Sequence, residues 1–314
     1  MPDTLTNITL LIHGGSGRIH QEPLTISKEN EYRQALAEAV QKGFELLQHG
    51  ETSVSAIETA IKILEDSPLF NAGRGAVFSN DEVIELDASI MDGAAFKAGA
   101  VAGVQTVKHP ISAARMVMEN SEHVMMTGRG AEKFAMIKGL VIVDPTYFKT
   151  EERWQQIIQI KKTEAPSSKV KNSLSKFGTV GAVALDKHGR LAAGTSTGGM
   201  LNKKYGRVGD SPIIGAGTYA NHICAVSGTG HGEYFIRHTV ARDIAALMEY
   251  KNLLVAEAAK AVLDKVAQAG GVGGVIALDA SGNIAMPHST EGMFWAYVKG
   301  DGKTEINICN MIIE

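Results

Sequence analysis

Apolar residues recur along the first part of the chain at the spacing of helices. A first helix is predicted over residues 30–48, where apolar positions repeat every three to four residues and Gly50 follows as a typical stop. A second begins after Thr52 or Ser53, either of which can cap a helix, and ends before Pro68. Both sequences have one apolar face, so both helices are expected to cover a larger apolar layer.

The same reasoning predicts helices further along the chain. Pro110 is well suited to the first position of a helix that runs to about Asn120. Residues 152–162 form a weaker helical pattern. Two more helices are expected at about 232–250 and 253–269, between segments rich in short apolar runs and glycine turns.

Those short apolar runs predict strands buried on both faces. Residues 8–12 read as a buried strand that enters a tight loop at 13–17, and residues 179–186 lack the alternation of a half-exposed strand. Residues 183–197 and 276–290 share a pattern of strand, Asp-x-x-Gly turn and strand, which indicates two hairpins of one antiparallel sheet. The predicted fold is α+β, with two facing central sheets and helices on both outer faces, an αββα layering.

A polar segment interrupts this pattern at residues 163–178. Ser, Lys and Asn dominate it, so it buries little surface and is expected to be an accessible linker. It ends at Gly178, and Thr179 opens the buried strand. This junction indicates cleavage between Gly178 and Thr179, giving fragments 1–178 and 179–314, because the threonine hydroxyl can attack the preceding carbonyl and glycine tolerates strained geometry there.

Cleavage would give Thr179 a free α-amine next to its own hydroxyl. The α-amino group has a reference pKa of about 7.7 to 8.0, so it is substantially unprotonated near neutral pH and suits a general base. Removal of Met1 cannot expose a threonine, since Pro2 follows it. An N-terminal nucleophile in this chain therefore requires internal cleavage.

Three other segments carry candidate chemistry. Thr197 ends the strand that pairs with the one opened by Thr179, so its hydroxyl is expected to reach the nucleophile. Arg207 and Asp210 lie in a glycine-flanked turn and together suit the carboxylate and ammonium of an amino acid, although a surface ion pair would look the same. Residues 227–230 offer a hydroxyl and an open backbone amide after a strand, which suits an oxyanion hole.

Composition and charge argue against several other classes of function for this protein. The chain has 314 residues and a net charge of −3, which gives no basic footprint for nucleic acid. Its two cysteines, Cys224 and Cys309, have no CxxC spacing, and the histidines show no HxxxH or HExxH pattern. The first residues contain neither a basic region nor an apolar run long enough for a signal peptide or membrane span. A cytoplasmic protein without organic cofactor is expected.

Taken together, these segments resemble the plant-type asparaginases and isoaspartyl peptidases, a family of N-terminal nucleophile hydrolases. The resemblance extends over nearly the whole chain outside the linker, in the family's order. The stretches that carry it are HGGSG (13–17), LFNAGRGAVF (69–78), ELDASIMDG (85–93), AGAVAGV (98–104), GTVGAVALD (178–186), TSTGGM (195–200), GRVGDSP (206–212), GAGTYA (215–220) and GTGHGE (228–233).

The resemblance implies a role for each matching position. Thr179 is the nucleophile, Thr197 assists it, and Asn71 positions the nucleophile region. Arg207 and Asp210 hold the substrate head. Thr229 and Gly230 form the oxyanion hole and contact substrate. The family's structural sodium ion would be bound by main-chain carbonyls of Leu64, Glu65, Ser67, Phe70, Ala72 and Arg74.

The implied reaction is hydrolysis of β-aspartyl amides, in L-asparagine or in β-aspartyl dipeptides, by one domain of residues 1–314 that is cleaved and associates as an (αβ)₂ heterotetramer. Glycosylasparaginase shares the chemistry and is the nearest alternative. A nucleotide-binding protein that uses its glycine loops belongs to a different class, although the loop at 13–17 matches no phosphate-binding motif. An uncleaved, inactive family member is also compatible with these residues.

Overall fold

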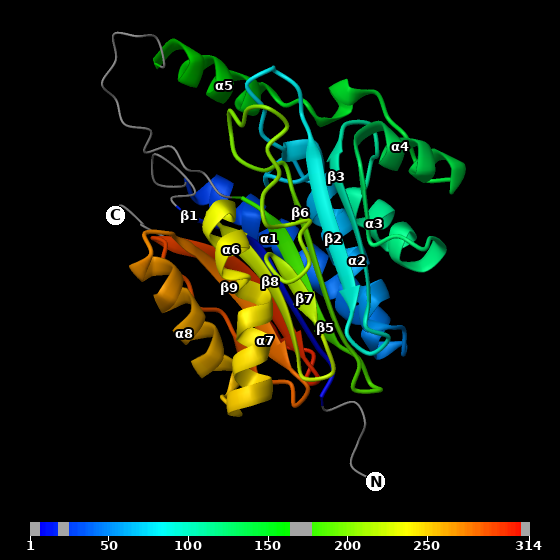
Figure 1. Cartoon of the computed structure of the whole chain (residues 1–314), viewed down its shortest axis with the longest axis vertical. Helices are drawn as coiled ribbons and strands as arrows, with labels where there is room; N and C mark the ends of the chain where they lie inside the picture. Colours follow the sequence, from blue (N-terminus) through cyan, green and yellow to red (C-terminus); the bar gives the residue numbers. More distant parts are fainter. Residues whose placement is uncertain (1–6, 18–24, 164–177, 309–314) are drawn as a thin grey trace.

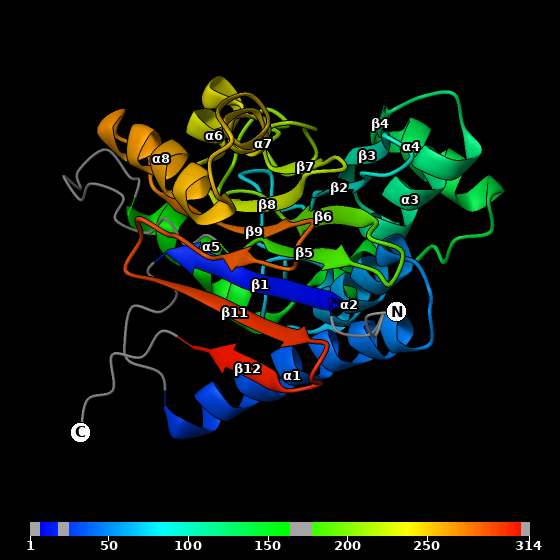
Figure 2. The same ribbon diagram turned by 90° about the horizontal axis from the view of Figure 1, so that it is seen from below.

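Two β-sheets lie face to face at the centre of the molecule, and helices cover their outer faces (Figures 1 and 2). The computed structural model describes residues 7–17, 25–163 and 178–308. Most of the predicted linker, residues 164–177, and Cys309 lie outside the described residues. The arrangement is the expected αββα layering of an N-terminal nucleophile hydrolase.

The larger sheet has eight strands in the order β12-β11-β1-β5-β6-β2-β3-β4. Its strands are β1 Thr9–Gly17, β2 Leu86–Asp92, β3 Lys97–Val104, β4 Met125–Thr127, β5 Val180–Leu185, β6 Leu191–Thr197, β11 Gly292–Lys299 and β12 Thr304–Asn307. All neighbouring pairs are antiparallel except β3 and β4, which run parallel. The smaller antiparallel sheet has the order β10-β9-β8-β7. Its strands are β7 Thr218–Ala220, β8 Cys224–Gly230, β9 Gly273–Asp279 and β10 Ile284–Ala285.

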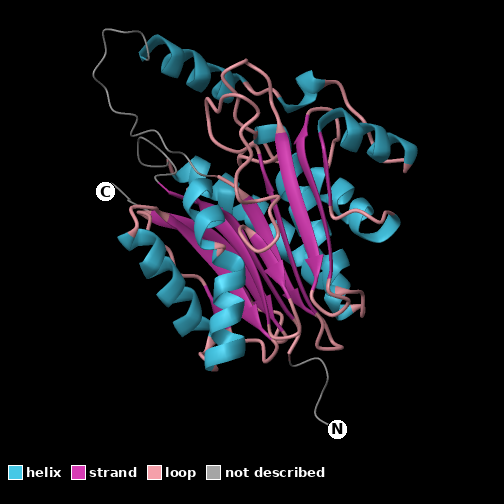
Figure 3. Cartoon of the chain, in the orientation of Figure 1, coloured by secondary structure: helices cyan, strands magenta, loops and turns pink. Residues whose placement is uncertain are grey.

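Helices cover the outer face of each sheet (Figures 2 and 3). The helices are α1 Ile26–Gln48, α2 Ser53–Asp66, α3 Pro110–Asn120, α4 Gly128–Ile137, α5 Glu151–Thr163, α6 Gly232–His238, α7 Val240–Lys251 and α8 Val255–Gln268, with short 3₁₀ turns η1 Gly73–Gly75 and η2 Pro145–Phe148. Helices α1, α2 and α3 pack on the larger sheet, and α7 and α8 on the smaller one. Among the described residues, no helix is long and apolar enough to cross a bilayer.

The hydrophobic core lies in layers because each sheet is buried on both faces. Between the sheets, Leu11 and Val183 belong to the same apolar cluster as Ile276 and Leu278 of the smaller sheet. A second cluster fills the space between the larger sheet and its helices, with Ile57 of α2 fully buried. Burying one such side chain contributes roughly 1.5–3 kcal/mol. This burial explains why β5 and β9 show no alternation of apolar and polar residues.

Several helix boundaries agree with the sequence pattern. Helix α3 begins at Pro110 and ends at Asn120 as predicted. At the start of α2 the Thr52 hydroxyl accepts a hydrogen bond from Ser55 N at 3.1 Å, so Thr52 is the cap. Helix α1 begins earlier than predicted, at Ile26, because Thr25 caps it and accepts from Lys28 N.

The predicted helix over 232–250 is wrong in one respect, because Thr239 divides it into α6 and α7. Thr239 has a left-handed backbone with φ of 46°, an unusual conformation for a β-branched residue. The break turns the chain so that Phe235 of α6 and Ile244 of α7 are both fully buried. Core packing on either side of Thr239 therefore overrides the continuous helical pattern.

Two strand predictions also need correction. Residues 13–17 continue β1 rather than forming a loop, because they pair with β11 across an irregularity between His13 and Gly15. The two similar hairpins lie in different sheets: β5 and β6 in the larger sheet, and β9 and β10 in the smaller one. Local sequence predicts a hairpin correctly but contains no information about which distant strands it joins.

Candidate active site

Thr179 lies at the end of the larger sheet, immediately before β5. In the β5–β6 ladder Val180 pairs with Ser196, which brings the next residues, Thr179 and Thr197, to the same end. Their hydroxyl oxygens are 2.9 Å apart and buried. The Thr197 oxygen also accepts a hydrogen bond from Gly199 N at 2.9 Å, which limits its rotation. The predicted contact between the two hydroxyls is therefore present.

Asn71 holds the segments on both sides of this pair. Its backbone N–H donates to the Gly178 carbonyl at 3.0 Å, and its carbonyl accepts from Gly198 N at 3.0 Å. Its side-chain amide donates to the Gly199 carbonyl at 2.7 Å and accepts from Val77 N at 2.9 Å. One residue therefore ties the bond before Thr179 to the turn after Thr197.

Gly178 fits this arrangement because it has no side chain. A Cβ atom there would lie 2.9 Å from the Asn71 Cβ and 3.2 Å from the Asn71 backbone nitrogen. The Gly178 carbonyl is the group that Thr179 would attack in chain cleavage. Its hydrogen bond from Asn71 N–H already points a donor at the oxygen on which negative charge would develop.

Thr229 and Gly230 end β8 and are tied to the Thr179 end of the molecule through β1. In the β1–β5 ladder His13 pairs with Gly181, so the residues of β1 after His13 lie near the beginning of β5. One of them, Ser16, donates its hydroxyl to the Thr229 carbonyl at 2.9 Å and its backbone N–H to the Thr229 hydroxyl at 3.3 Å. The location agrees with the predicted role of Thr229 and Gly230, but that role itself stays a prediction.

His13 contributes a neutral side chain beside this region. Burial lowers its pKa to about 3, and the neighbouring Thr179 backbone opposes this shift only in part. Its Nε2 atom lies 3.0 Å from the Ser227 hydroxyl, within hydrogen-bond distance. A neutral imidazole here adds no charge close to Thr179.

Arg207 and Asp210 come together with a third residue, Glu233 of α6. The Arg207 guanidinium donates from Nε and Nη2 to the two Glu233 oxygens at 2.8 and 3.0 Å. No hydrogen bond from its Nη1 atom is present within the described parts of the chain. The guanidinium packs against glycine backbone, since a Cβ on Gly209 would lie 2.8 Å from Nη1. Arg207 therefore keeps donors available for a further carboxylate.

Asp210 is a buried acceptor with unused capacity. Asp210 is only 5% exposed, and its Oδ2 atom has no hydrogen-bond partner among the described residues. Burial raises the pKa of Asp210 to about 7, and the positive charge of Arg207 opposes this only in part. A ligand ammonium group would satisfy the free oxygen and favour the ionised carboxylate.

In the loop after α2, two backbone carbonyls lie close to glycine residues. A Cβ on Gly73 would lie 2.2 Å from the Glu65 carbonyl oxygen, and one on Gly75 would lie 2.1 Å from that of Phe70. Arg74 between them is exposed, so its side chain does not enter the loop. Within residues 7–17, 25–163 and 178–308, no cluster of His, Cys, Asp or Glu could hold a metal, but a site made of carbonyls needs none.

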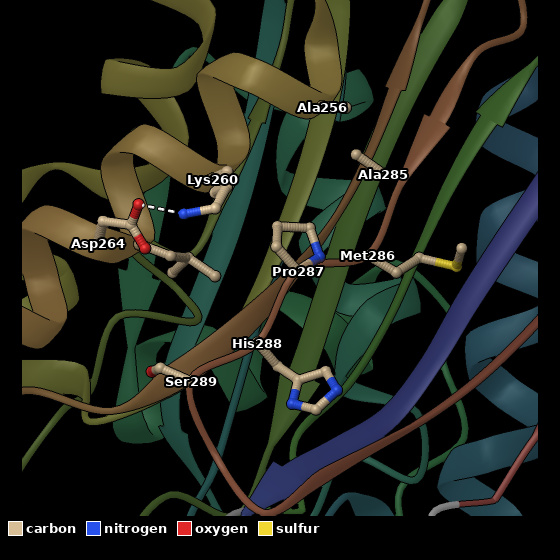
Figure 4. A pocket seen from close by; sticks show the side chains of 9 residues that line it. Ala256, Lys260, Asp264, Ala285, Met286, Pro287, His288 and Ser289 are labelled. Atoms are coloured by element: carbon tan, nitrogen blue, oxygen red, sulfur yellow. Dashed lines mark hydrogen bonds and ion pairs between the residues drawn. The ribbon is translucent and has the colours of Figure 1, made fainter.

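An open pocket of about 640 Å³ lies elsewhere, along α8 and the segment after β10 (Figure 4). It shares none of the predicted site residues. Its charged side chains, Lys260 and Asp264, pair with each other at 2.5 Å and are both exposed. Among the described residues, none of the buried side-chain atoms without a hydrogen-bond partner belongs to a residue that lines this pocket.

Sequence reasoning missed several residues around the site. Glu233 lies in the GTGHGE stretch, but no spacing rule identifies it as the partner of Arg207. The Glu65 carboxylate was also missed: it is fully buried and accepts from the Ser196 hydroxyl at 2.6 Å and from Ile111 N at 3.0 Å. Burial raises the pKa of Glu65, although its hydrogen bond to His109 opposes this. Only the folded chain brings these residues together.

The chain is similar in sequence to several known proteins. The chain is 50% identical over 303 residues to the isoaspartyl peptidase of Escherichia coli, with 94% of each chain covered. It is 40% identical over 301 residues to the plant-type L-asparaginase of Pyrococcus abyssi, covering 93% of this chain and 96% of that one. The isoaspartyl peptidase/L-asparaginase of Mus musculus is 40% identical over 307 residues, with 96% and 91% covered. The family model described as asparaginase matches residues 6–308, and the chain belongs to that family.

Proposed function

We propose that this chain is a threonine hydrolase that cleaves itself between Gly178 and Thr179 and then hydrolyses β-aspartyl amide bonds. The substrates are L-asparagine and β-aspartyl dipeptides, and aspartate is released from both. Membership of the asparaginase family and relatives named isoaspartyl peptidase or L-asparaginase support hydrolysis of this bond. The observation that carries the proposal is the buried contact of 2.9 Å between the Thr179 and Thr197 hydroxyls, directly after the Gly178 carbonyl.

Activation begins with an attack by the Thr179 hydroxyl on the Gly178 carbonyl carbon. The oxygen of that carbonyl gains negative charge, which the Asn71 N–H stabilises through its hydrogen bond of 3.0 Å. The peptide C–N bond breaks and an ester forms on the Thr179 oxygen. Water then hydrolyses the ester, so residues 1–178 end in a carboxylate and Thr179 has a free amine.

In the second reaction the same hydroxyl attacks the side-chain carbonyl of the substrate. The Thr179 α-amine accepts the hydroxyl proton and passes it to the leaving nitrogen, which departs as ammonia or as an amino acid. Thr229 and Gly230 would face the developing oxyanion. Water hydrolyses the aspartyl ester and restores Thr179. Thr197 holds the nucleophile in position through its own hydroxyl.

The substrate head would bind between Arg207 and Asp210. Arg207 would donate to the α-carboxylate, since Glu233 occupies Nε and one Nη2 donor and leaves the others. Asp210 would accept from the α-ammonium with its unpartnered Oδ2. Both groups contact the end that asparagine and β-aspartyl dipeptides share, so this geometry accommodates either substrate.

A sodium ion would fit the loop after α2 as a structural element. The carbonyl oxygens of Glu65 and Phe70 lie close to the glycines of η1, and backbone carbonyl oxygens are ligands that suit a monovalent cation. The other ligands would be the carbonyls of Leu64, Ser67, Ala72 and Arg74. Since Asn71 lies in the same loop, the ion would stabilise the segment that holds Gly178.

The cleaved protein would assemble as an (αβ)₂ heterotetramer in the cytoplasm. The family resemblance supports this assembly, and light scattering would test it by returning twice the mass of one chain. Glycosylasparaginase activity is the alternative within the same chemistry. A glycosylated asparagine hydrolysed faster than asparagine or a β-aspartyl dipeptide would favour that alternative.

Two measurements on the purified protein test the main proposal. Mass spectrometry should find fragments 1–178 and 179–314, and the smaller one should begin at Thr179. Thr179→Ala should remain full length and hydrolyse neither L-asparagine nor a β-aspartyl dipeptide. A wild-type chain that stays intact and inactive would contradict the proposal, and cleavage of Thr179→Ala would assign the nucleophile to another residue.

A further inference from the structure

A row of buried hydroxyl groups crosses the space between the two sheets near the predicted site. It begins at Ser227 of β8, whose Oγ lies 2.7 Å from Thr195 Oγ1 of β6. Thr195 Oγ1 lies 2.6 Å from Thr218 Oγ1 of β7, and Thr218 Oγ1 lies 2.8 Å from Ser89 Oγ of β2. All four residues are fully buried. We call Ser89, Thr195, Thr218 and Ser227 the hydroxyl row.

The row ends on the segment that carries the substrate-binding pair. Ser89 donates to the Ser211 carbonyl at 2.6 Å, and Thr218 lies 3.3 Å from the same oxygen. Ser211 directly follows Asp210, whose own carbonyl accepts from Gly217 N at 3.1 Å. A carbonyl can only accept, so the contact of 2.6 Å takes the single proton of Ser89.

At its other end, the hydroxyl row contacts β6, the strand that ends at Thr197 and pairs with the strand that follows Thr179. Ser89 pairs with Thr195 in the β2–β6 ladder, and Asp87 of the same strand pairs with Thr197. Thr195 and Thr197 are two residues apart in one strand and face the same side of the sheet. Ser89 therefore links the backbone next to Asp210 to the strand that supports Thr197.

We propose that Ser89 is a positioning residue that sets the distance between the nucleophile and the substrate-binding pair. This inference rests on the proposed function. A substrate must reach Thr179 with its carbonyl while Asp210 and Arg207 hold its head, so both ends must be placed accurately. Movement of the Ser211 backbone would displace the adjacent Asp210 from the substrate ammonium, which weakens binding of the substrate head and raises KM.

The hydrogen bonds of the Ser89 side chain explain why a hydroxyl is needed at position 89. Replacing Ser89 with alanine leaves the buried Ser211 carbonyl with the longer contact to Thr218 alone. A buried carbonyl that loses its donor is unfavourable, so the segment would move toward another donor. Chain cleavage depends on Thr179, Thr197 and Asn71, none of which bonds to Ser89.

The test compares Ser89→Ala with Ser112→Ala. Ser112 is also buried, and its hydroxyl donates to Glu58 in the α2–α3 contact, away from the row. Both variants lose one buried donor, so both should lower Tm. Ser89→Ala should still cleave at Thr179, and its KM should rise roughly tenfold, by the same factor for L-asparagine and a β-aspartyl dipeptide, with kcat nearly unchanged. Ser112→Ala should keep the wild-type KM.

Ser89→Cys keeps the shape with a weaker donor, so its KM should fall between those of wild type and Ser89→Ala. It also gives a readout if the alanine variant does not fold. A wild-type KM in either folded Ser89 variant, with only a lower Tm, would overturn the inference and leave the proposed function intact. A wild-type protein that hydrolyses neither substrate would instead refute the proposed function.

Discussion

Gly178 is a residue whose identity follows from a single contact. The space that a side chain would need is occupied by Asn71, which is held by four hydrogen bonds to Gly178, Gly198, Gly199 and Val77. Asn71 therefore cannot move without losing several of these bonds. The requirement for glycine comes from this crowding, since Gly178 is not among the residues with positive φ.

The prediction for Gly178→Ala is slower chain cleavage. The added Cβ would lie 2.9 Å from the Asn71 Cβ, so the Asn71 N–H would move away from the carbonyl that must be attacked. Loss of such a donor costs roughly 100-fold or more in rate. Denaturing electrophoresis over time measures the intact fraction. Gly130→Ala is the matched control, because nothing lies within 4 Å of a Cβ there. Cleavage of Gly178→Ala at the wild-type rate would contradict the argument.

Asp210 leads to a prediction about pH. Burial raises its pKa to about 7, so it is protonated in acid and ionised above neutral pH. Only the ionised form attracts the substrate ammonium. KM should therefore rise as pH falls below about 7, by roughly tenfold per pH unit, while higher pH leaves it constant. Steady-state kinetics from pH 5 to 8 measure this, and Asp210→Asn should have a high KM without the slope. A flat KM profile in the wild-type enzyme would remove Asp210 from the head site.

Which of these residues can be predicted from sequence depends on how far apart their partners lie. Thr179 and Thr197 belong to one hairpin, so strand pairing predicts their contact. Asn71 is more than 100 residues from Gly178, and only the family resemblance indicated its role. Ser89 and Thr218 have no local signal, because their partners come from distant strands of both sheets.

Whether a helix or strand can be predicted also depends on how far along the chain its packing partners lie. The α3 boundaries follow from Pro110 and the apolar period, both of which are local. The division of α6 from α7 at Thr239 does not, because no glycine or proline marks it and packing of both helices decides it. Likewise residues 15–17 become strand through pairing with β11, nearly 280 residues later, and His13 pairs with both β11 and β5. Elements stabilised by their own sequence were predicted, whereas those shaped by remote partners were not.

The loop between α2 and η1 leads to a prediction about sodium binding. If it binds sodium, a sodium concentration ten times Kd would add about 1.4 kcal/mol of stability and raise Tm by roughly 2 °C for a chain of this length. Thermal unfolding in sodium chloride and in choline chloride at equal ionic strength measures the difference. Equal Tm values in the two salts would argue against the cation.

Two glycine variants test whether the stabilisation by sodium comes from this loop. Gly73→Ala places a Cβ 2.2 Å from the Glu65 carbonyl oxygen and should abolish the response to sodium. Gly139→Ala has comparable backbone strain, with φ of 79°, but nothing within 4 Å of the Cβ. It should be destabilised yet keep the response. If both variants respond alike, the ion lies elsewhere.

The order of strands in the larger sheet determines what cleavage does to the whole molecule. Residues before the cut supply β1 to β4, and residues after it supply β5 to β12. In the sheet, β1 lies between β11 and β5, and β6 pairs with β2. The two fragments therefore share three strand pairings and the core between the sheets. The proposed cleavage would change one peptide bond and leave these contacts in place.

We therefore predict that the fragments stay associated after cleavage. The cleaved protein should elute from gel filtration at the volume of uncleaved Thr179→Ala, and the fragments should separate only in denaturant. Separation would expose a strand edge on each side of β1 and the buried core between the sheets, which is unfavourable. Native mass spectrometry would report both fragments in one particle. Elution of fragments 1–178 and 179–314 as separate native species would contradict the interleaved sheet. Since Asn71 and Thr179 come from different fragments, it would also leave the active site without its positioning residue.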